Sequence, residues 1–283
     1  MDQGSRQDRV VGAVVGSAVG DALGAPFEFG PAGVYTTRFP EGVGAMCGGG
    51  GWDPGEATDD TQMAVLVGES LLERDGLDLA DMFGRFRRWA AGEPKDIGLQ
   101  TEYVLTSGDP WDVAAALHFQ VEGRAAGNGS LMRAATSAVY FARADGPEPA
   151  ARAATMDAAL PGALAAVHDD QRERWASVLT PDWHPGLATE FNGAVWPCLG
   201  TAVWALRTTH TFEAALAAAI DVGGDTDTVA AVTGGLAGAV HGRGAIPSRW
   251  TEPLHVPLPG FGDRVLRTAQ LTALARNLDS HRS

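Results

Sequence analysis

The chain has 283 residues, of which 45% are hydrophobic and 20% charged, a balance typical of a folded globular protein and not of a disordered one. Its 21 Lys and Arg stand against 35 Asp and Glu, and the formal net charge of −14 argues against binding DNA, RNA or an anionic membrane through bulk charge. The two cysteines, Cys47 and Cys198, belong to no CxxC pair. We therefore expect neither a disulfide framework nor structural zinc, and a cytoplasmic protein with reduced thiols.

The first predicted element is a helix over residues 11–24. Its apolar residues follow the i, i+3, i+4, i+7 spacing of one buried face. Glycine recurs at positions 12, 16, 20 and 24, which on a helix forms a bare ridge that another backbone can approach closely. Pro26 predicts the end of this helix, and Glu28 follows on the exit loop. We expect no membrane span, because no apolar run approaches the length that one needs. We expect no signal peptide either, because acidic residues precede a run that is mostly Val, Gly and Ala.

A glycine-rich loop is predicted over residues 42–56, without the lysine of a phosphate-binding loop. Its Trp52 is equally a candidate for packing and for stacking on a base. A helix follows from about residue 59 and is closed by Asp75 and Gly76. Amphipathic patterns predict helices over 78–92 and 109–120, and residues 127–135 predict a turn that leads into a helix through Tyr140.

The last third of the chain is also helical by pattern. Two helices are predicted over 195–207 and 211–220, and then one from residue 225 that is almost free of charge and therefore buried on all sides. Residues 144–190 carry no clear pattern, and alternating strand patterns are scarce. The predicted fold class is all-α, in a single domain over 1–283 with its core at about 8–275.

Two acidic clusters stand directly before apolar helices, namely Thr58-Asp59-Asp60-Thr61 and Asp225-Thr226-Asp227-Thr228. Helix capping explains one Asp or Thr at each position. It does not explain two carboxylates and two hydroxyls in the same arrangement twice. Because clustered carboxylates are costly without a countercharge, we favour a metal site over caps alone.

The candidate ligands are hard oxygen donors. They are the carboxylates of Asp59, Asp60, Asp225, Asp227 and Glu28 and the hydroxyls of Thr58 and Thr228. Such a set suits Mg²⁺, Mn²⁺ or Ca²⁺, not Zn²⁺ or copper. Since five carboxylates exceed the charge of one divalent ion, two ions are plausible.

A third feature is the run Gly127-Asn128-Gly129-Ser130. Its glycines free the backbone to point N–H groups at an anion, and Ser130 adds a hydroxyl at the start of a helix. Taken alone, a plain turn with an Asn or Ser cap explains the run equally well.

In this order, GSAVGDALGAPFEF, TDDTQMAVLVGESLL, GNGSLMRAA and GGDTDTVAAVTGGLAGAVHG resemble the motifs of the ADP-ribosylglycohydrolase family. The resemblance implies an all-α fold with a binuclear Mg²⁺ or Mn²⁺ centre at the base of a cleft. The implied metal ligands are Thr58, Asp59, Asp60, Asp225, Asp227 and Thr228. Glu28 would be a mobile acid beside the metals, residues 127–130 would line the diphosphate and ribose site, and Gly223 and Gly224 would let the substrate approach the backbone.

The sequence departs from the family pattern at one place. Between the GNGSLMR and GGDTDT motifs the family usually carries a Thr-His pair that helps hold the phosphates. The comparable stretch here reads Ala154-Thr155-Met156-Asp157, without a histidine. This departure concerns the binding of ADP-ribose and leaves the predicted metal site unchanged.

The predicted activity is hydrolysis of the N- or O-glycosidic bond of an ADP-ribose conjugate, with Asp60 or Glu28 as general base or as the group that stabilises the cationic transition state. The acceptor would be a protein arginine or serine or a small conjugate, and the net charge disfavours a nucleic acid. Two alternatives stay open. One is a metal-dependent phosphoester hydrolase, and the other is a non-catalytic ADP-ribose-binding protein.

Overall fold

The computed structural model describes residues 6–142 and 152–281. Of residues 152–158 it describes the backbone alone. The fold is all-α, as predicted. The α-helices are α1 (Arg6–Gly24), α2 (Val34–Arg38), α3 (Asp59–Glu73), α4 (Leu79–Ala90), α5 (Leu99–Thr106), α6 (Ala114–Glu122), α7 (Gly129–Met132), α8 (Ala134–Phe141), α9 (Arg152–Ala166), α10 (Asp169–Val178), α11 (Val195–Thr208), α12 (Phe212–Ile220), α13 (Thr226–His241), α14 (Ser248–Thr251) and α15 (Thr268–Ser280). Short 3-10 turns cover η1 (Ala25–Phe27), η2 (Pro185–Leu187) and η3 (Arg243–Ala245).

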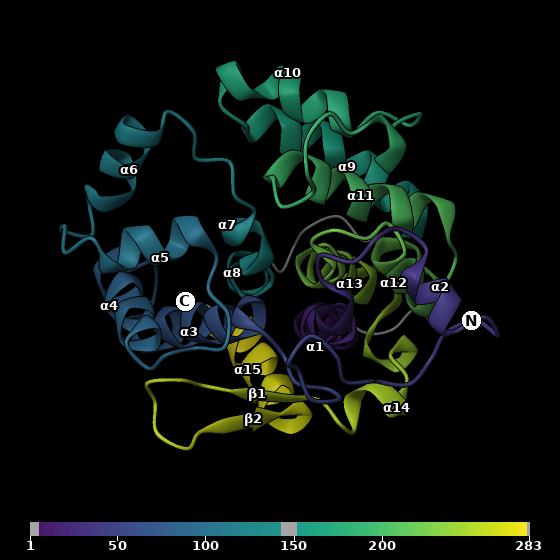
Figure 1. The fold of residues 1–283 in the computed structure, drawn as a ribbon, viewed down its shortest axis with the longest axis horizontal. Coiled ribbons are helices and arrows are strands. Elements are labelled where there is room, and N and C mark those ends of the chain that lie inside the picture. The colour runs from purple at the N-terminus through teal and green to yellow at the C-terminus, as the bar shows by residue number, and fades with distance from the viewer. Residues whose placement is uncertain (1–5, 143–151, 282–283) are drawn as a thin grey trace.

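Helices α1 and α13 lie side by side at the centre of the molecule (Figure 1). The glycine ridge of α1 makes this close approach possible, because a Cβ on Gly12 or Gly16 would overlap the carbonyl oxygen of Gly238 or Gly234 on α13. The relation is reciprocal, since a Cβ on either α13 glycine would overlap α1. The predicted ridge is thus confirmed, and its partner is the buried helix that begins at the second acidic cluster.

By length and composition, residues 6–27 are long and apolar enough to cross a membrane, contrary to our expectation from the sequence. However, 89% of the apolar window is buried inside the protein. The window therefore has the surroundings of a core helix. This is the central helix of the fold, which explains why it is apolar on nearly every side.

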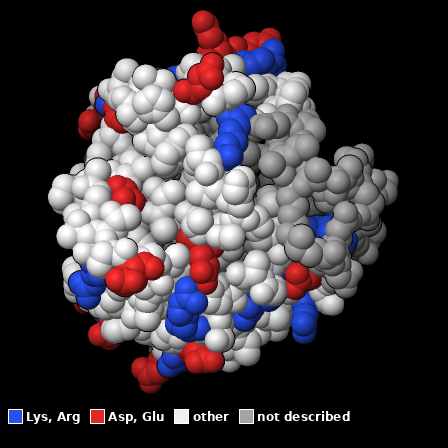
Figure 2. All heavy atoms as spheres, turned by 90° about the vertical axis from the view of Figure 1, so that its right-hand side faces the viewer, with Lys and Arg blue, Asp and Glu red and all other residues white. Residues whose placement is uncertain are grey.

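The other helices surround this pair. α3, α8 and α15 pack on one side, and α11 and α12 pack against α13 (Figure 1). A small antiparallel hairpin of β1 (His255–Pro257) and β2 (Val265–Arg267), with Val256 opposite Leu266, leads into α15. On the face shown in Figure 2, blue Lys and Arg side chains are interspersed with red Asp and Glu side chains.

Several local predictions need correction. α6 begins at Ala114 after an N-cap at Val113 that makes no side-chain cap bond, and not at the acidic residues before it. α5, α9, α10 and the β-hairpin have no counterpart in the sequence-based prediction. Trp52 is buried, with the Lys95 ammonium 5.4 Å from its ring centroid, and it is not among the cleft-lining residues described below. It therefore packs against the protein and is not presented to a base.

Candidate functional site

The first acidic cluster forms the start of α3. Thr58 is the N-cap, and its hydroxyl accepts the backbone N–H of Asp60 at 3.4 Å. The fully buried carboxylate of Asp21, on α1, accepts the backbone N–H groups of Thr58 at 3.0 Å and Thr61 at 3.1 Å, and also the Thr61 hydroxyl. Asp21 was missed by the sequence analysis. It fixes the direction in which Asp59 and Asp60 project.

The second cluster forms the start of α13, after two glycines in the left-handed region. Gly223 has φ of 76° and Gly224 has φ of 77°, a conformation that favours glycine. Asn192 joins both ends of this turn: its side-chain amide donates to the Gly223 carbonyl at 2.8 Å, and its side-chain oxygen accepts the Asp225 N–H at 3.0 Å. Asn192 is a second positioning residue that no motif in the sequence marks.

The two clusters meet face to face. The Thr58 hydroxyl lies 3.5 Å from a carboxylate oxygen of Asp227, and the Thr228 hydroxyl lies 3.4 Å from a carboxylate oxygen of Asp60. One threonine of each cluster thus contacts an aspartate of the other. Because α1 holds α3 through Asp21 and holds α13 through the glycine ridge, the central helix sets this juxtaposition.

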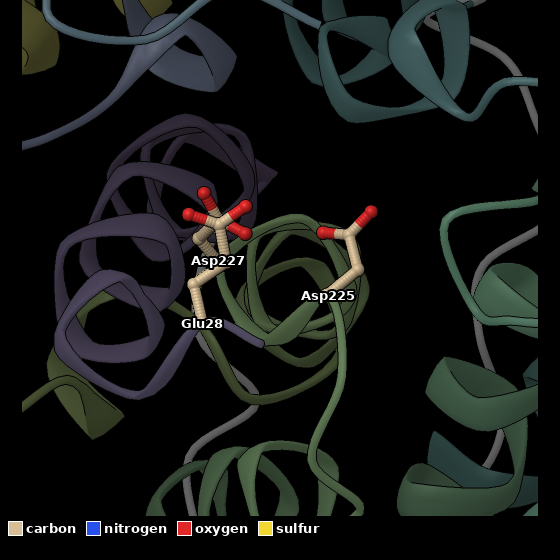
Figure 3. A group of neighbouring side chains, drawn as sticks. All are labelled: Glu28, Asp225 and Asp227. Carbon is tan, nitrogen blue, oxygen red and sulfur yellow. The ribbon is translucent and has the colours of Figure 1, made fainter. Parts of the chain in front are cut away.

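Two groups of three carboxylates result, each with ligand atoms within 4.8 Å of one another. One group is Glu28, Asp225 and Asp227, and the other is Asp59, Asp60 and Asp227. Figure 3 shows the first group gathered at the N-terminal end of α13, with Glu28 reaching in from the segment after α1. Asp227 belongs to both groups, so the two candidate cation positions are adjacent.

The carboxylates of the cluster are buried close together, which is electrostatically unfavourable when they are charged. One carboxylate oxygen of Asp60 and one of Asp225 are buried without a hydrogen-bond partner. Burial, together with repulsion from neighbouring carboxylates, raises the pKa of Asp59, Asp60 and Asp227 well above the ordinary value. The same causes raise the pKa of Glu28 to about 8. The charged forms are therefore unfavourable unless a positive ion joins them.

The donor set fits a hard divalent ion such as Mg²⁺ or Mn²⁺, because the atoms that the two groups offer as ligands are all carboxylate oxygens. The structure brings together every residue predicted as a ligand: Thr58, Asp59, Asp60, Asp225, Asp227, Thr228 and Glu28. Their roles as ligands stay predictions.

A cleft of about 1310 Å³ opens from this cluster to the surface. Gly127, Asn128, Gly129 and Ser130 line it, together with the acidic residues, whereas Gly223 and Gly224 are not among its lining residues. A Cβ on Gly223 would come within 2.7 Å of the Gly30 carbonyl, so the chain itself fills the space beside that glycine. The Asn128 amide donates to Asp225 at 2.9 Å, which joins the predicted anion-binding run to the acidic cluster.

The cleft also contains residues that the sequence analysis missed. Asp96 lies on its wall, and burial raises the pKa of this carboxyl. Phe29 and Phe191 are 73% and 57% exposed and stack with ring centroids 6.5 Å apart. Phe29 has φ of 60°, which is uncommon outside glycine, and its N–H donates to Gly224 at 2.6 Å. This bond ties the Glu28 segment to the start of α13.

The altered Thr-His position falls outside the described side chains, since Met156 and Asp157 lie within residues 152–158. Two histidines follow further along the chain, His168 and His184. His168 is bonded to Asp170 at 2.7 Å, and neither histidine is among the cleft-lining residues. Among the described residues that line the cleft, His118 is the one histidine, at the outer end near α5.

Fold and site together define an all-helical protein whose cleft ends on a paired cluster of oxygen donors. A sequence profile of the ADP-ribosylglycohydrolase family matches residues 2–161 and 156–282, and the chain belongs to this family of hydrolases. It is 29% identical to the ADP-ribosyl-[dinitrogen reductase] glycohydrolase of Rhodospirillum rubrum, over 88% of this chain and 91% of the relative. It is 30% identical to ADP-ribosylarginine hydrolase Tri1 of Serratia proteamaculans (strain 568), over 87% of this chain and 75% of the relative.

A solved structure described as an ADP-ribosylglycohydrolase-related protein complex is also similar. It superposes with a TM-score of 0.66 at 33% sequence identity, and the match covers 98% of both chains. The similarity therefore extends over nearly the whole length of both chains.

Proposed function

We propose that this chain hydrolyses the glycosidic bond between ADP-ribose and an arginine side chain, with two Mg²⁺ or Mn²⁺ ions. The observation that carries the proposal is that two sets of three carboxylate side chains share Asp227 at the base of the cleft. An arginine acceptor is favoured because one relative, from Serratia proteamaculans, is an ADP-ribosylarginine hydrolase.

Thr58, Asp59, Asp60, Asp225, Asp227 and Thr228 would hold the ions. When bound, such ions supply charge that orients the ribose hydroxyls and stabilises developing negative charge. Asp60 and Asp227 are deeply buried at this end of the cleft. The run from Gly127 to Ser130 would bind the diphosphate through backbone N–H groups.

Glu28 is the better candidate of the two predicted bases. Both residues line the cleft, but Glu28 is half-buried, whereas Asp60 is buried and one of its oxygens already accepts the Thr228 hydroxyl. In the reaction, water forms a bond to the anomeric carbon as the bond from that carbon to the guanidine nitrogen breaks. Glu28 would accept a proton from the water and return it to the departing guanidine, so that free ADP-ribose and arginine result.

The test is release of ADP-ribose from arginine-linked and serine-linked conjugates, measured with Mg²⁺, with Mn²⁺ and with EDTA. The arginine conjugate should be cleaved only with metal, and Asp225→Asn should lose the activity at unchanged folding. Cleavage of the serine conjugate alone would contradict the acceptor assignment. Full activity in EDTA would contradict the metal assignment, and release of phosphate in place of ADP-ribose would identify a phosphoester hydrolase.

A further inference from the structure

Helix α6 presents apolar side chains to solvent. Leu117, Phe119 and Val121 are 40%, 52% and 71% exposed, and the preceding turn adds exposed Trp111 and Val113. No charged residue occurs between positions 113 and 121. Val113, Leu117 and Val121 are spaced four residues apart and so lie on one side of α6, whereas Phe119 points to another side. An exposed apolar surface of this kind on a folded chain marks an interaction site. We call Trp111, Val113, Leu117 and Val121 the α6 face.

The α6 face is continuous with the outer wall of the cleft. On α6 itself, His118 and Glu122 line the cleft, and His118 packs on Tyr103 of α5 with ring centroids 4.6 Å apart. In Figure 1, α6 lies at the edge of the molecule, beyond α5 as seen from the central helix pair. A macromolecule that places a modified side chain in the cleft has its bulk outside, and the outer wall is where that bulk meets the enzyme.

Charge distinguishes the possible occupants. The rim next to the α6 face carries the exposed acids Glu102 and Glu122, and the chain as a whole has a net charge of −14. A second copy of the chain would bring two acidic surfaces together, which repel. A basic protein surface with apolar side chains beside the modified residue is complementary in both respects.

From these observations we propose that the α6 face docks the ADP-ribosylated acceptor protein, through a basic surface that also carries apolar side chains. This assignment rests on the proposed function. It has a consequence for specificity: the enzyme cleaves a conjugate on a basic protein more efficiently than the same conjugate on free arginine.

The experiment compares two substrates, an arginine-ADP-ribosylated histone and free ADP-ribosylarginine. The variant is Leu117→Ser with Val121→Ser, two exposed residues on one side of α6 that do not line the cleft. Its kcat/KM on the histone should fall by ~10-fold or more, mainly through KM, because two apolar contacts are lost. Its kcat/KM on free ADP-ribosylarginine should stay unchanged. Leu187→Ser, which changes a 54% exposed leucine outside the cleft lining, is the matched control and should affect neither substrate.

Each other outcome overturns a defined part of the proposal. If the double variant keeps the wild-type kcat/KM on both substrates, or loses the same factor on both, docking at the α6 face is overturned while the hydrolase assignment stands. A wild-type dimer that the double variant converts to a monomer, measured by light scattering, with unchanged histone kinetics, assigns the face to a second copy. If the wild-type protein releases ADP-ribose from neither substrate, the proposed function fails and the docking assignment fails with it.

Discussion

Replacing Gly20 with alanine tests whether the close contact of α1 and α13 sets the geometry of the acidic site. A Cβ at this position would overlap the carbonyl group of Ala230 and would lie 3.0 Å from the Ala231 nitrogen. Since ordinary contact with carbon needs about 3.5 Å, the helices must separate by roughly 1 Å or more. The obstacle is backbone, which cannot rotate away as a side chain can.

Overpacking of a well-packed core costs about 1–3 kcal/mol and occasionally more, and this overlap belongs at the upper end of that range. Alanine is favoured over glycine in a helix by about 1 kcal/mol, which offsets part of the loss. We therefore expect Gly20→Ala to lower the free energy of unfolding by about 2 kcal/mol or more, measured by urea denaturation. Because α13 carries Asp225 and Asp227, the apparent affinity for Mg²⁺ should fall as well.

Gly84→Ala is the matched control for this experiment. Gly84 lies within α4, and a Cβ there would meet nothing within 4 Å. This substitution should raise stability by roughly 0.5–1 kcal/mol and leave Mg²⁺ affinity unchanged. If Gly20→Ala behaves like Gly84→Ala in both measurements, the contact between α1 and α13 does not set the geometry of the site.

Three further predictions concern the acidic site. Asp227→Asn removes the carboxylate common to both groups, so the rise in Tm on adding Mg²⁺ should disappear, as calorimetry would show; a retained rise would place the ions elsewhere. In the metal-free protein, the pKa of Asp21 is raised to about 6 and that of Glu28 to about 8, so the folded state holds more protons than the unfolded chain above about pH 4. The unfolding free energy without metal should therefore fall as the pH rises from about 4 to 8, and Mg²⁺ should lessen the fall; a rise over this range would contradict it. Asp21→Asn keeps one acceptor oxygen where the carboxylate has two, so fewer of the bonds to the start of α3 can form. The free energy of unfolding should fall by about 1–3 kcal/mol in denaturation, and ADP-ribose release should slow. Unchanged values in both assays would show that Asp21 does not position α3.

The sequence predicted best those helices that have a buried face. α1, α3 and α13 carry their burial pattern in their own residues, and the two acidic clusters are dense enough to stand out against ordinary capping. α10 has no buried residue and α5 buries only Leu105, so neither leaves a clear apolar period in the sequence. The short β-hairpin has only three residues in each strand, too few for an alternating pattern to be recognised.

The residues missed in the site share a different property. Asp21, Asn192 and Asp96 are single polar residues outside the acidic clusters, and they reach the site through tertiary contacts with distant segments. A capping or metal motif is a local pattern, but the bond from Asp21 to the start of α3 depends on how two helices cross. The sequence does mark Asp21 in one way. It is the one carboxylate on the buried part of α1, where nearly all other side chains are small or apolar.

The central helix pair bears directly on how the acidic site is neutralised. The last glycine of the ridge, Gly24, abuts the start of α13, and its carbonyl accepts the Thr226 hydroxyl at 2.9 Å. This contact fixes the position of Asp225 and Asp227 relative to Glu28, which follows on the same segment. The N-termini of α3 and α13 each supply about half a positive charge, which is one unit for five carboxylates. The helix ends therefore compensate only a small part of this negative charge, which is why the proposed function assigns cations to the cluster that the central helix pair holds together.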